Sequence, residues 1–292
     1  MLDPSGCSTD AEVPVGESPS ETWTECVVAE RGWVCYPAGV TGDAPPAALA
    51  GTRRVSPGGH EPPPNPGSGR WPSPFTSGSA DDRSGWSKLC NLQRRILPQI
   101  VYYVTASDAL GPINVCVPSG NFGNVFSGWI ARRMGAPIDQ LVVAANANDI
   151  LERFFNRNDM STAPVVPSLS PSMDIQVSSN FERLLFEMNG RDGGLTAEQL
   201  QHFRASGRLT VEDDQRAAHL EGRFRAARLD DAETLGVISR TYADTGMLLD
   251  PHSAVGVGAV AKLRSAGQLE GTTVTLATAH PAKFPDAVEQ AT

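Results

Sequence analysis

A loop of glycine and asparagine residues stands between two apolar runs at residues 117–124, which read Val-Pro-Ser-Gly-Asn-Phe-Gly-Asn. Gly120 and Gly123 would let an anion approach the backbone closely, because glycine has no side chain to block it. Asn121 and Asn124 add amide donors and tolerate left-handed backbone angles. The N–H groups and the dipole of the helix predicted to follow favour a phosphate or a carboxylate. The pattern indicates an anion-binding loop, with a tight turn and a capped helix as the alternative.

A second group of polar side chains lies at residues 174–183, in the stretch Asp-Ile-Gln-Val-Ser-Ser-Asn-Phe-Glu-Arg. Two hydroxyls, an amide and a guanidinium near a helix start suit the phosphate of a substrate, and they belong to Ser178, Ser179, Asn180 and Arg183. The alternative is an ordinary helix cap at Asn180, with Glu182 and Arg183 in solvent.

Further candidates lie near the end of the chain, in the stretch Thr-Leu-Ala-Thr-Ala-His-Pro-Ala-Lys-Phe at residues 275–284. His280 and Lys283 could bind a substrate anion, or they could be a capped turn and a surface side chain. Taken alone, Thr278 is a residue that bonds locally at a strand end. His252 falls in the first turn of a predicted helix, where a single histidine is more often a structural contact than a catalytic base.

Strands and helices must position these groups, and their predicted order is strand, loop, helix, strand, helix from residue 113 to residue 155. This order makes a parallel βαβ unit, so the fold class is α/β with a parallel sheet flanked by helices. Apolar runs predict strands at residues 113–119, 140–146 and 272–280. Helical spacing and caps predict helices at residues 94–110, 125–135, 148–155, 180–190, 196–207, 230–246, 250–267 and 281–291. The long polar connection at residues 157–179 is expected to be functional or disordered.

Several helix starts carry a capping signal. Asn148 or Asp149 is predicted to cap one helix, and Asp250 to cap another. Thr196 and Gln199 have the spacing of a capping box.

The composition divides the chain in two. About three in ten of the first 85 residues are proline or glycine, and hardly any apolar periodicity is present there. So little apolar surface cannot offset the entropy of ordering the chain. We therefore expect a disordered or non-homologous tail at residues 1–90, followed by one globular region at residues 91–292.

Charge and cysteine content exclude several classes of protein. The net charge of −9 argues against a nucleic-acid partner. The five cysteines form no Cys-x-x-Cys pair, so neither a disulfide framework nor a metal site is expected. The sequence has no apolar run of membrane-spanning length and no secretory leader, which predicts a cytoplasmic protein. The basic residues Arg223, Arg225 and Arg228 are interpreted as a solvated helix face. The oligomeric state is left open.

Five stretches, in this order and at these separations, resemble the C-terminal half of the threonine synthase family: residues 117–124, 169–186, 230–238, 248–259 and 276–285. The resemblance covers about residues 95–288. It implies the type II fold of enzymes that use pyridoxal 5′-phosphate (PLP), in an incomplete form. It also implies a lyase reaction in which O-phosphohomoserine, a small phosphorylated amino acid, loses phosphate and takes up water to give threonine.

The resemblance also implies roles for individual residues. The PLP phosphate would be bound by the glycine and asparagine loop, which means by Gly120, Asn121, Phe122, Gly123 and Asn124. The hydroxyl of Thr278 would face the pyridine nitrogen of PLP. A neutral hydroxyl does not hold that nitrogen protonated as a carboxylate would, so it moderates the cofactor as an electron sink.

One element of the family pattern is missing. A threonine synthase forms its Schiff base from a lysine in a Phe-Lys-Asp context, near a Thr-Ser-Gly-Asp-Thr-Gly segment, and this sequence has neither. Its lysines are Lys88, Lys262 and Lys283, none in that context. No catalytic residue is therefore assigned. The resemblance stops near Arg95, which we interpret as a truncation with an unrelated tail or as a misread reading frame.

Two functions follow from these observations. The first is a threonine synthase-like lyase that is truncated and inactive as written. The second is a non-catalytic module that binds phosphate or PLP, or that regulates a full-length homologue. A generic nucleotide-binding domain is disfavoured, because no acidic ribose ligand follows the loop.

Overall fold

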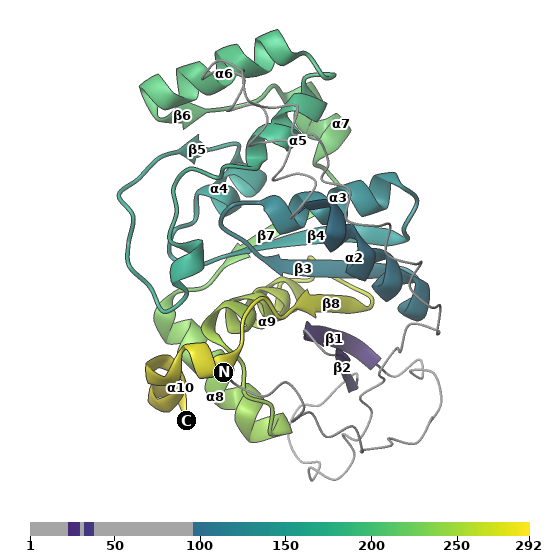
Figure 1. The fold of residues 1–292 in the computed structure, drawn as a ribbon, viewed down its shortest axis with the longest axis vertical. Coiled ribbons are helices and arrows are strands. Elements are labelled where there is room, and N and C mark those ends of the chain that lie inside the picture. Colours follow the sequence, from purple (N-terminus) through teal and green to yellow (C-terminus); the bar gives the residue numbers. More distant parts are fainter. Residues whose placement is uncertain (1–22, 30–31, 38–95) are drawn as a thin grey trace, which may run out of the picture.

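The computed structural model describes residues 23–29, 32–37 and 96–292, and its centre is a six-stranded sheet (Figure 1). The strand order is β2-β1-β8-β3-β4-β7. All neighbouring pairs are parallel except β1 and β2, which are antiparallel. The bounds are β1 (Trp23–Ala29), β2 (Gly32–Pro37), β3 (Ile113–Pro118), β4 (Ile138–Ala145), β7 (Phe224–Arg228) and β8 (Thr273–Leu276). The predicted α/β class with a parallel sheet is confirmed.

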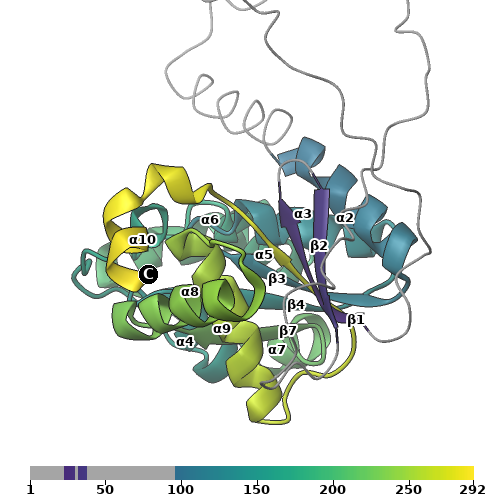
Figure 2. The same cartoon turned by 90° about the horizontal axis from the view of Figure 1, so that it is seen from below.

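Helices cover both faces of this sheet (Figures 1 and 2). One face carries α3 (Gly123–Arg133) and α4 (Ile150–Arg157), with α2 (Leu97–Leu110) packed on α3. The other face carries α9 (Pro251–Ser265), with α8 (Asp231–Thr245) packed on α9 and α10 (Pro285–Ala291) on α8. A smaller part beyond α4 contains β5 (Met160–Ser161), η3 (Pro171–Met173), α5 (Phe181–Met188), α6 (Gly193–Ser206), β6 (Arg208–Leu209) and α7 (Asp213–His219). A short 3₁₀ turn, η4 (Pro281–Lys283), precedes α10.

The core has two layers because side chains alternate along the buried strands. In β3, Val115 and Val117 join the cluster under α3 and α4, whereas Cys116 joins the cluster under α9. The same alternation occurs in β4, where Val143 faces the first cluster and Val142 the second. Both faces of the central strands are therefore buried, as expected for a parallel sheet between helices.

Helix α9 lies close to the sheet because two of its residues lack side chains. A Cβ on Gly256 would lie 2.7 Å from Thr275 Cγ2, and a Cβ on Gly258 would lie 2.2 Å from Leu229 Cδ2. Atoms at those separations would overlap. The helix begins as predicted at Asp250, whose side chain accepts the backbone N–H of His252 at 2.9 Å.

Two predictions about elements are wrong. The capping box at Thr196 does not form, because α6 begins a turn earlier at Asp192, whose side chain accepts the N–H of Leu195 at 2.9 Å. Arg225 and Arg228 lie in strand β7 and not on a helix face. This strand is defined by its pairing with β4, which local periodicity does not reveal.

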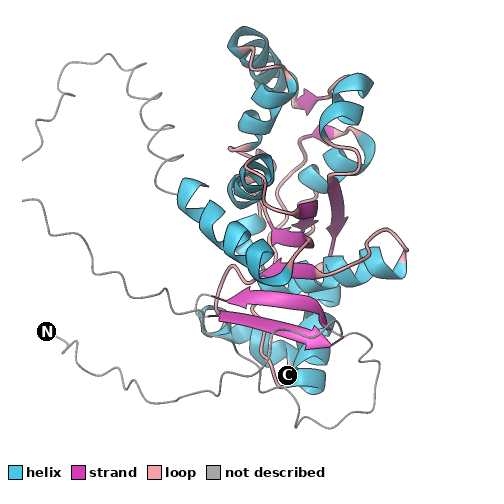
Figure 3. Ribbon diagram, turned by 90° about the vertical axis from the view of Figure 1, so that its right-hand side faces the viewer, coloured by secondary structure: helices cyan, strands magenta, loops and turns pink. Residues whose placement is uncertain are grey.

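The predicted N-terminal tail contains two strands, β1 and β2, which pair with each other at one edge of the sheet (Figure 3). β1 also pairs in parallel with β8, so the stretch predicted as a tail includes two strands of the sheet. Averaging the composition over 85 residues hid them, although both are rich in residues that favour strands. The rest of the predicted tail, and the predicted boundary at residues 90 and 91, lie outside the described residues.

The described residues contain neither a membrane-spanning helix nor a cluster of metal-ligating side chains. Among residues 23–29, 32–37 and 96–292, no helix has the length and apolar character needed to cross a bilayer. No group of three or more potential metal-ligating side chains occurs in the same residues.

Candidate functional site

The glycine and asparagine loop connects the carboxyl end of β3 to the start of α3, as predicted. Ser119 donates its N–H to the carbonyl of Ala144 at the end of β4, at 3.0 Å. The Ser119 hydroxyl in turn accepts the N–H of Phe122 at 3.1 Å. Phe122 has a left-handed backbone conformation, with φ of 63°. The loop thus turns sharply over the ends of two parallel strands.

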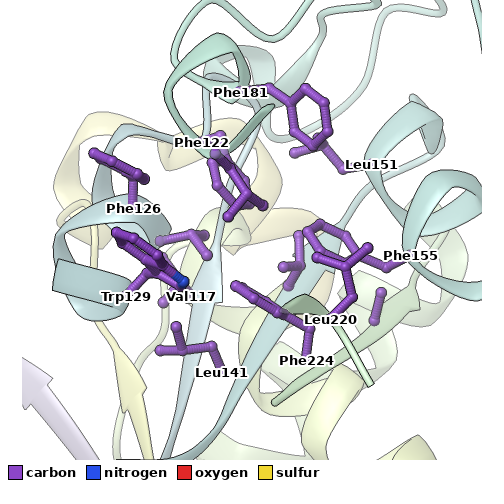
Figure 4. Close-up of a cluster of buried hydrophobic side chains, with 14 of the residues drawn as sticks. Val117, Phe122, Phe126, Trp129, Leu141, Leu151, Phe155, Phe181, Leu220 and Phe224 are labelled. Atoms are coloured by element: carbon purple, nitrogen blue, oxygen red, sulfur yellow. The ribbon is translucent and has the colours of Figure 1, made fainter. Parts of the chain in front are cut away.

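The side chain of Phe122 points into the core and not towards solvent (Figure 4). Its ring stacks on Phe155 and meets the edge of Phe181, with centroids 5.8 Å apart in both cases. Phe122 was predicted as a phosphate ligand, but its side chain lies in the core and its N–H donates to the Ser119 hydroxyl.

Both glycines of the loop are closely packed, Gly120 more tightly than Gly123. A Cβ on Gly120 would lie 2.6 Å from Ile175 Cδ1 and 3.1 Å from the Cα of Met173. A Cβ on Gly123 would lie 3.1 Å from Asn180 Nδ2. Neither glycine has a positive φ, so close packing and not backbone strain explains the residue type here.

The structure brings the two predicted polar groups together. The carbonyl of Asn121 accepts both the backbone N–H and the side-chain Nδ2 of Asn180, each at 3.1 Å. Ser179 Oγ donates to Asn121 Oδ1 at 3.1 Å. The starts of α3 and α5 therefore meet at Asn121. Asn180 directly precedes α5, but its side chain makes no capping hydrogen bond to that helix. The alternative prediction of an ordinary helix cap at Asn180 is therefore wrong.

Ser178 and Arg183 differ in their surroundings. Ser178 Oγ is buried and has no hydrogen-bond partner among the described residues. A buried hydroxyl without a partner is costly, which makes it a candidate to bind a ligand. Arg183 Nε donates to Asn180 Oδ1 at 3.3 Å. The Arg183 side chain also lines a mostly apolar groove of about 730 Å³ between α3, α5 and α6.

Asn124 is held by two tyrosines of α2. Tyr103 donates its hydroxyl to Asn124 Oδ1 at 2.9 Å and to the Asn124 carbonyl at 2.8 Å, and Tyr102 donates to the same Oδ1. Burial raises the pKa of both tyrosine hydroxyls, so they stay protonated and serve as donors. The Asn124 side chain is therefore oriented by α2, a contact that the sequence did not predict.

Thr278 lies two residues beyond β8, at the same edge of the sheet as the loop. Strands β3 and β8 are parallel neighbours, with Cys116 opposite Thr275. Their carboxyl ends therefore meet, which places the exposed Thr278 and the loop after Pro118 on one side of the sheet. This is the placement that binding of one cofactor by both segments requires.

The remaining candidates are His280, Lys283 and His252. His280 Nδ1 accepts the N–H of Ala282 at 3.2 Å, as in the capped-turn alternative, and Lys283 is exposed. His252 is buried; its Nδ1 lies 3.0 Å from Asp250 Oδ1, and its Nε2 accepts the N–H of Ser172 at 3.3 Å. His252 is thus a structural contact, as predicted.

The carboxylate of Asp250 makes stability depend on pH. Burial tends to raise its pKa, but hydrogen bonds from His252 and Ser253 outweigh burial and lower the pKa below the usual value of an aspartate. A carboxylate with a lowered pKa contributes stability above the unfolded value and loses it as the pH falls through the folded value. We expect the melting temperature of the wild type to fall more steeply below pH 4 than that of Asp250→Ala. Calorimetry from pH 3 to pH 6 measures this, and parallel profiles would contradict it.

A buried polar network beside the loop was missed. Asn148 was expected as a helix cap, but its Nδ2 donates to the carbonyl of Val166 at 2.8 Å and to Asp174 Oδ1 at 2.9 Å. Asn146 Nδ2 donates to the same Oδ1 at 2.7 Å. The only signal in the sequence is a pair of asparagines directly after a buried strand. Asp149 occupies the cap position of α4 but makes no capping bond.

Comparison with known proteins identifies the origin of this architecture. The family described as "Threonine synthase, C-terminal" matches residues 253–292. Threonine synthase from Pseudomonas aeruginosa is 50% identical over 201 residues, which are 68% of this chain. This chain is homologous to the C-terminal part of threonine synthase. Threonine synthase from Saccharomyces cerevisiae is 37% identical over 225 residues.

Solved structures agree with this assignment. A PLP-bound threonine synthase from Brucella melitensis superposes with a TM-score of 0.64 at 41% identity, over 72% of this chain and 48% of the other. Threonine synthase from yeast gives a TM-score of 0.62 at 36% identity. The predicted family and fold are therefore confirmed.

The chain spans less than half the length of the relatives that it matches. It covers 42% of the Pseudomonas threonine synthase and 43% of the solved yeast enzyme. Neither of the two lysines that the structure describes is buried beside the loop. Lys262 pairs with Glu233 at 2.7 Å beside α8, Lys283 is exposed in η4, and Lys88 lies outside the described residues.

Proposed function

We propose that this chain binds the phosphate of PLP in the loop at residues 119–124, as the C-terminal part of a PLP-dependent threonine synthase. The observation that carries this proposal is the close packing of Gly120 against Ile175 and of Gly123 against Asn180, at the meeting point of α3 and α5. Such a site offers backbone N–H groups and two helix termini to an anion. The PLP bound in the Brucella relative supports the choice of anion.

The residues present fit this group. Gly120 and Gly123 would contribute backbone N–H groups, whereas the N–H of Phe122 already donates to Ser119 Oγ and its side chain lies in the core. Asn121 and Asn124 would contribute side chains. Because two tyrosine hydroxyls bind Asn124 Oδ1, its amide nitrogen is the atom left to donate to a phosphate.

Thr278 would complete the cofactor site from the neighbouring strand. PLP supplies an electron sink when it is bound. A hydroxyl can donate one hydrogen bond to an unprotonated pyridine nitrogen without carrying a charge, so Thr278 would orient the ring and leave its nitrogen neutral.

The substrate that we propose is O-phosphohomoserine, which a threonine synthase converts to threonine and phosphate. Ser178, Ser179, Asn180 and Arg183 would bind its phosphate group. The partnerless Ser178 hydroxyl supports this role, and so does the position of Asn180 against Asn121. Arg183 would have to swing out of the groove that it lines, so its role depends on a side-chain rotation.

The positions of the described lysines favour a chain that binds PLP but does not by itself convert O-phosphohomoserine. None of the described lysines shares the edge of the sheet with the loop in a buried position, so no residue is placed to hold PLP covalently and to move protons. A PLP-binding or phosphate-binding module, or a regulator of a full-length homologue, is therefore the second function that we consider.

Substitution of Gly123 tests the loop. We expect Gly123→Val to weaken the binding of inorganic phosphate and of PLP by about tenfold or more, because its side chain pushes Asn180 away from Asn121. The thermal shift produced by increasing phosphate measures this.

Gly236→Val is the matched control, since a Cβ there meets only Arg240 Nη1 at 3.5 Å on α8. An equal phosphate shift in the wild type and in both variants would make the loop purely structural.

A further inference from the structure

The long connection before α5 is tied to the sheet by one carboxylate. Asp174 Oδ1 accepts hydrogen bonds from Asn146 Nδ2 at 2.7 Å, Asn148 Nδ2 at 2.9 Å and Ser168 Oγ at 2.6 Å. Asp174 Oδ2 accepts the backbone N–H of Ser168 at 2.9 Å. Four donors from two segments thus converge on this side chain.

The same strand end also anchors the glycine and asparagine loop. Asn146 and Asn148 directly follow β4, and Ala144 near the end of β4 accepts the N–H of Ser119. The loop and Asp174 are therefore both bonded to residues 144–148, at the end of β4 and directly after it.

The neighbours of Asp174 form a wall against the loop. Met173 and Ile175 flank it in sequence, and both lie within 3.1 Å of the position that a Cβ on Gly120 would occupy. A displacement of Asp174 would move these residues relative to Gly120. The closest packing in the loop thus depends on where this carboxylate is held.

The other side of η3 is held separately. Ser172 donates its N–H to His252 Nε2 at 3.3 Å, and His252 is fixed by Asp250 at 3.0 Å. Met173 lies between these two anchors and is only 3% exposed. The wall is therefore held at two points: Ser172 is bonded to α9, and Asp174 is bonded to the residues that follow β4.

We propose that Asp174 is a positioning residue that sets the shape of the phosphate loop by holding Met173 and Ile175 against Gly120. The identity of the ligand rests on the proposed function above, whereas the positioning role rests on the contacts of Asp174 alone. Asp174 does not itself bind the anion, which a carboxylate would repel.

The carboxylate is needed because every group that faces it is a donor. An asparagine at this position keeps one acceptor oxygen but turns an NH₂ group towards the N–H of Ser168 or the amides of Asn146 and Asn148. Two donors that face each other cannot bond, and one of the four hydrogen bonds at least is lost. Asp174→Asn is thus a nearly isosteric change that releases the wall.

The test compares Asp174→Asn with Asp230→Ala in the full chain. Asp230 accepts the N–H of Glu233 at 2.8 Å at the start of α8, so its loss destabilises the fold without touching the loop. Hydrogen–deuterium exchange of the peptide that covers residues 119–124 reports the loop itself without any ligand. Titration with inorganic phosphate, well below the melting temperature, reports binding.

We expect Asp174→Asn to speed exchange in this peptide several-fold and to weaken phosphate binding about tenfold, while Asp230→Ala changes neither. Unchanged exchange in Asp174→Asn would overturn the positioning role, whatever its effect on melting temperature. If exchange rises but phosphate binds neither the wild type nor the variant, the positioning role stands and the proposed function fails. If exchange rises and phosphate binds both equally, the loop shape does not control binding and the inference is wrong.

Discussion

The 292-residue chain, supplied with PLP, is expected to release no measurable phosphate from O-phosphohomoserine. Proton transfer by a positioned general acid or base contributes roughly 10²-fold to 10⁴-fold to a rate, and covalent attachment of the cofactor is lost in addition. Among the described residues, Lys262 is engaged by Glu233 and Lys283 is exposed in η4. A continuous assay of released phosphate, with threonine measured by chromatography, checks this result.

The Pseudomonas threonine synthase is the positive control, assayed at the same PLP concentration. Absorbance of the PLP-treated chain before and after dialysis shows whether a lysine holds the cofactor covalently. Phosphate release that disappears in Lys283→Ala would show that this lysine serves as the missing base, and the expectation of an inactive chain would then be wrong.

Phe122→Ala is expected to lower the free energy of unfolding by about 3–5 kcal/mol, because it leaves a cavity in a well-packed core. The Phe122 side chain is fully buried, and its ring contacts the rings of Phe155, Phe181 and Phe224. These contacts also compensate for the left-handed backbone at residue 122, which a bulky side chain adopts at a cost. Urea denaturation followed by tryptophan fluorescence measures the change.

Val101→Ala is the matched control for that measurement. Val101 is 64% exposed on α2, so its truncation is expected to change stability by less than about 0.5 kcal/mol. A loss of similar size in both variants would mean that Phe122 is not the centre of the core.

Elements with local signals could be predicted from the sequence, because their determinants lie within a few residues. The strand that ends at Pro118, the stop of α2 at Gly111 and the cap of α9 at Asp250 all appear where the residue types place them. Thr196 shows the limit of such signals. Two capping patterns overlap there, and Asp192 forms the cap, while the Thr196 hydroxyl donates to the Asp192 carbonyl at 2.6 Å.

The site could be predicted only in its parts. The loop and the stretch around Asn180 were found separately, but their meeting depends on the folding of the chain between Asn121 and Asn180, which are 59 positions apart. Asp174 gave no signal, since two of its four donors, Asn146 and Asn148, lie 28 and 26 residues upstream. Side chains that act on a site through tertiary contacts leave no local pattern, whereas those that shape a turn do.

The place of β8 in the sheet has a consequence for the synthesis of the chain. This strand, the last in sequence, lies between β1 and β3 and not at an edge. Until the ribosome has delivered Leu276, β3 has no neighbour on that side, and its backbone groups face solvent along one edge. Pairing across such sequence separations is slow, and open strand edges attract other chains. The sheet of the nascent protein therefore lacks one of its inner strands until translation is nearly complete. During that time its open strand edges are accessible to chaperones and proteases, before the site for a cofactor has formed.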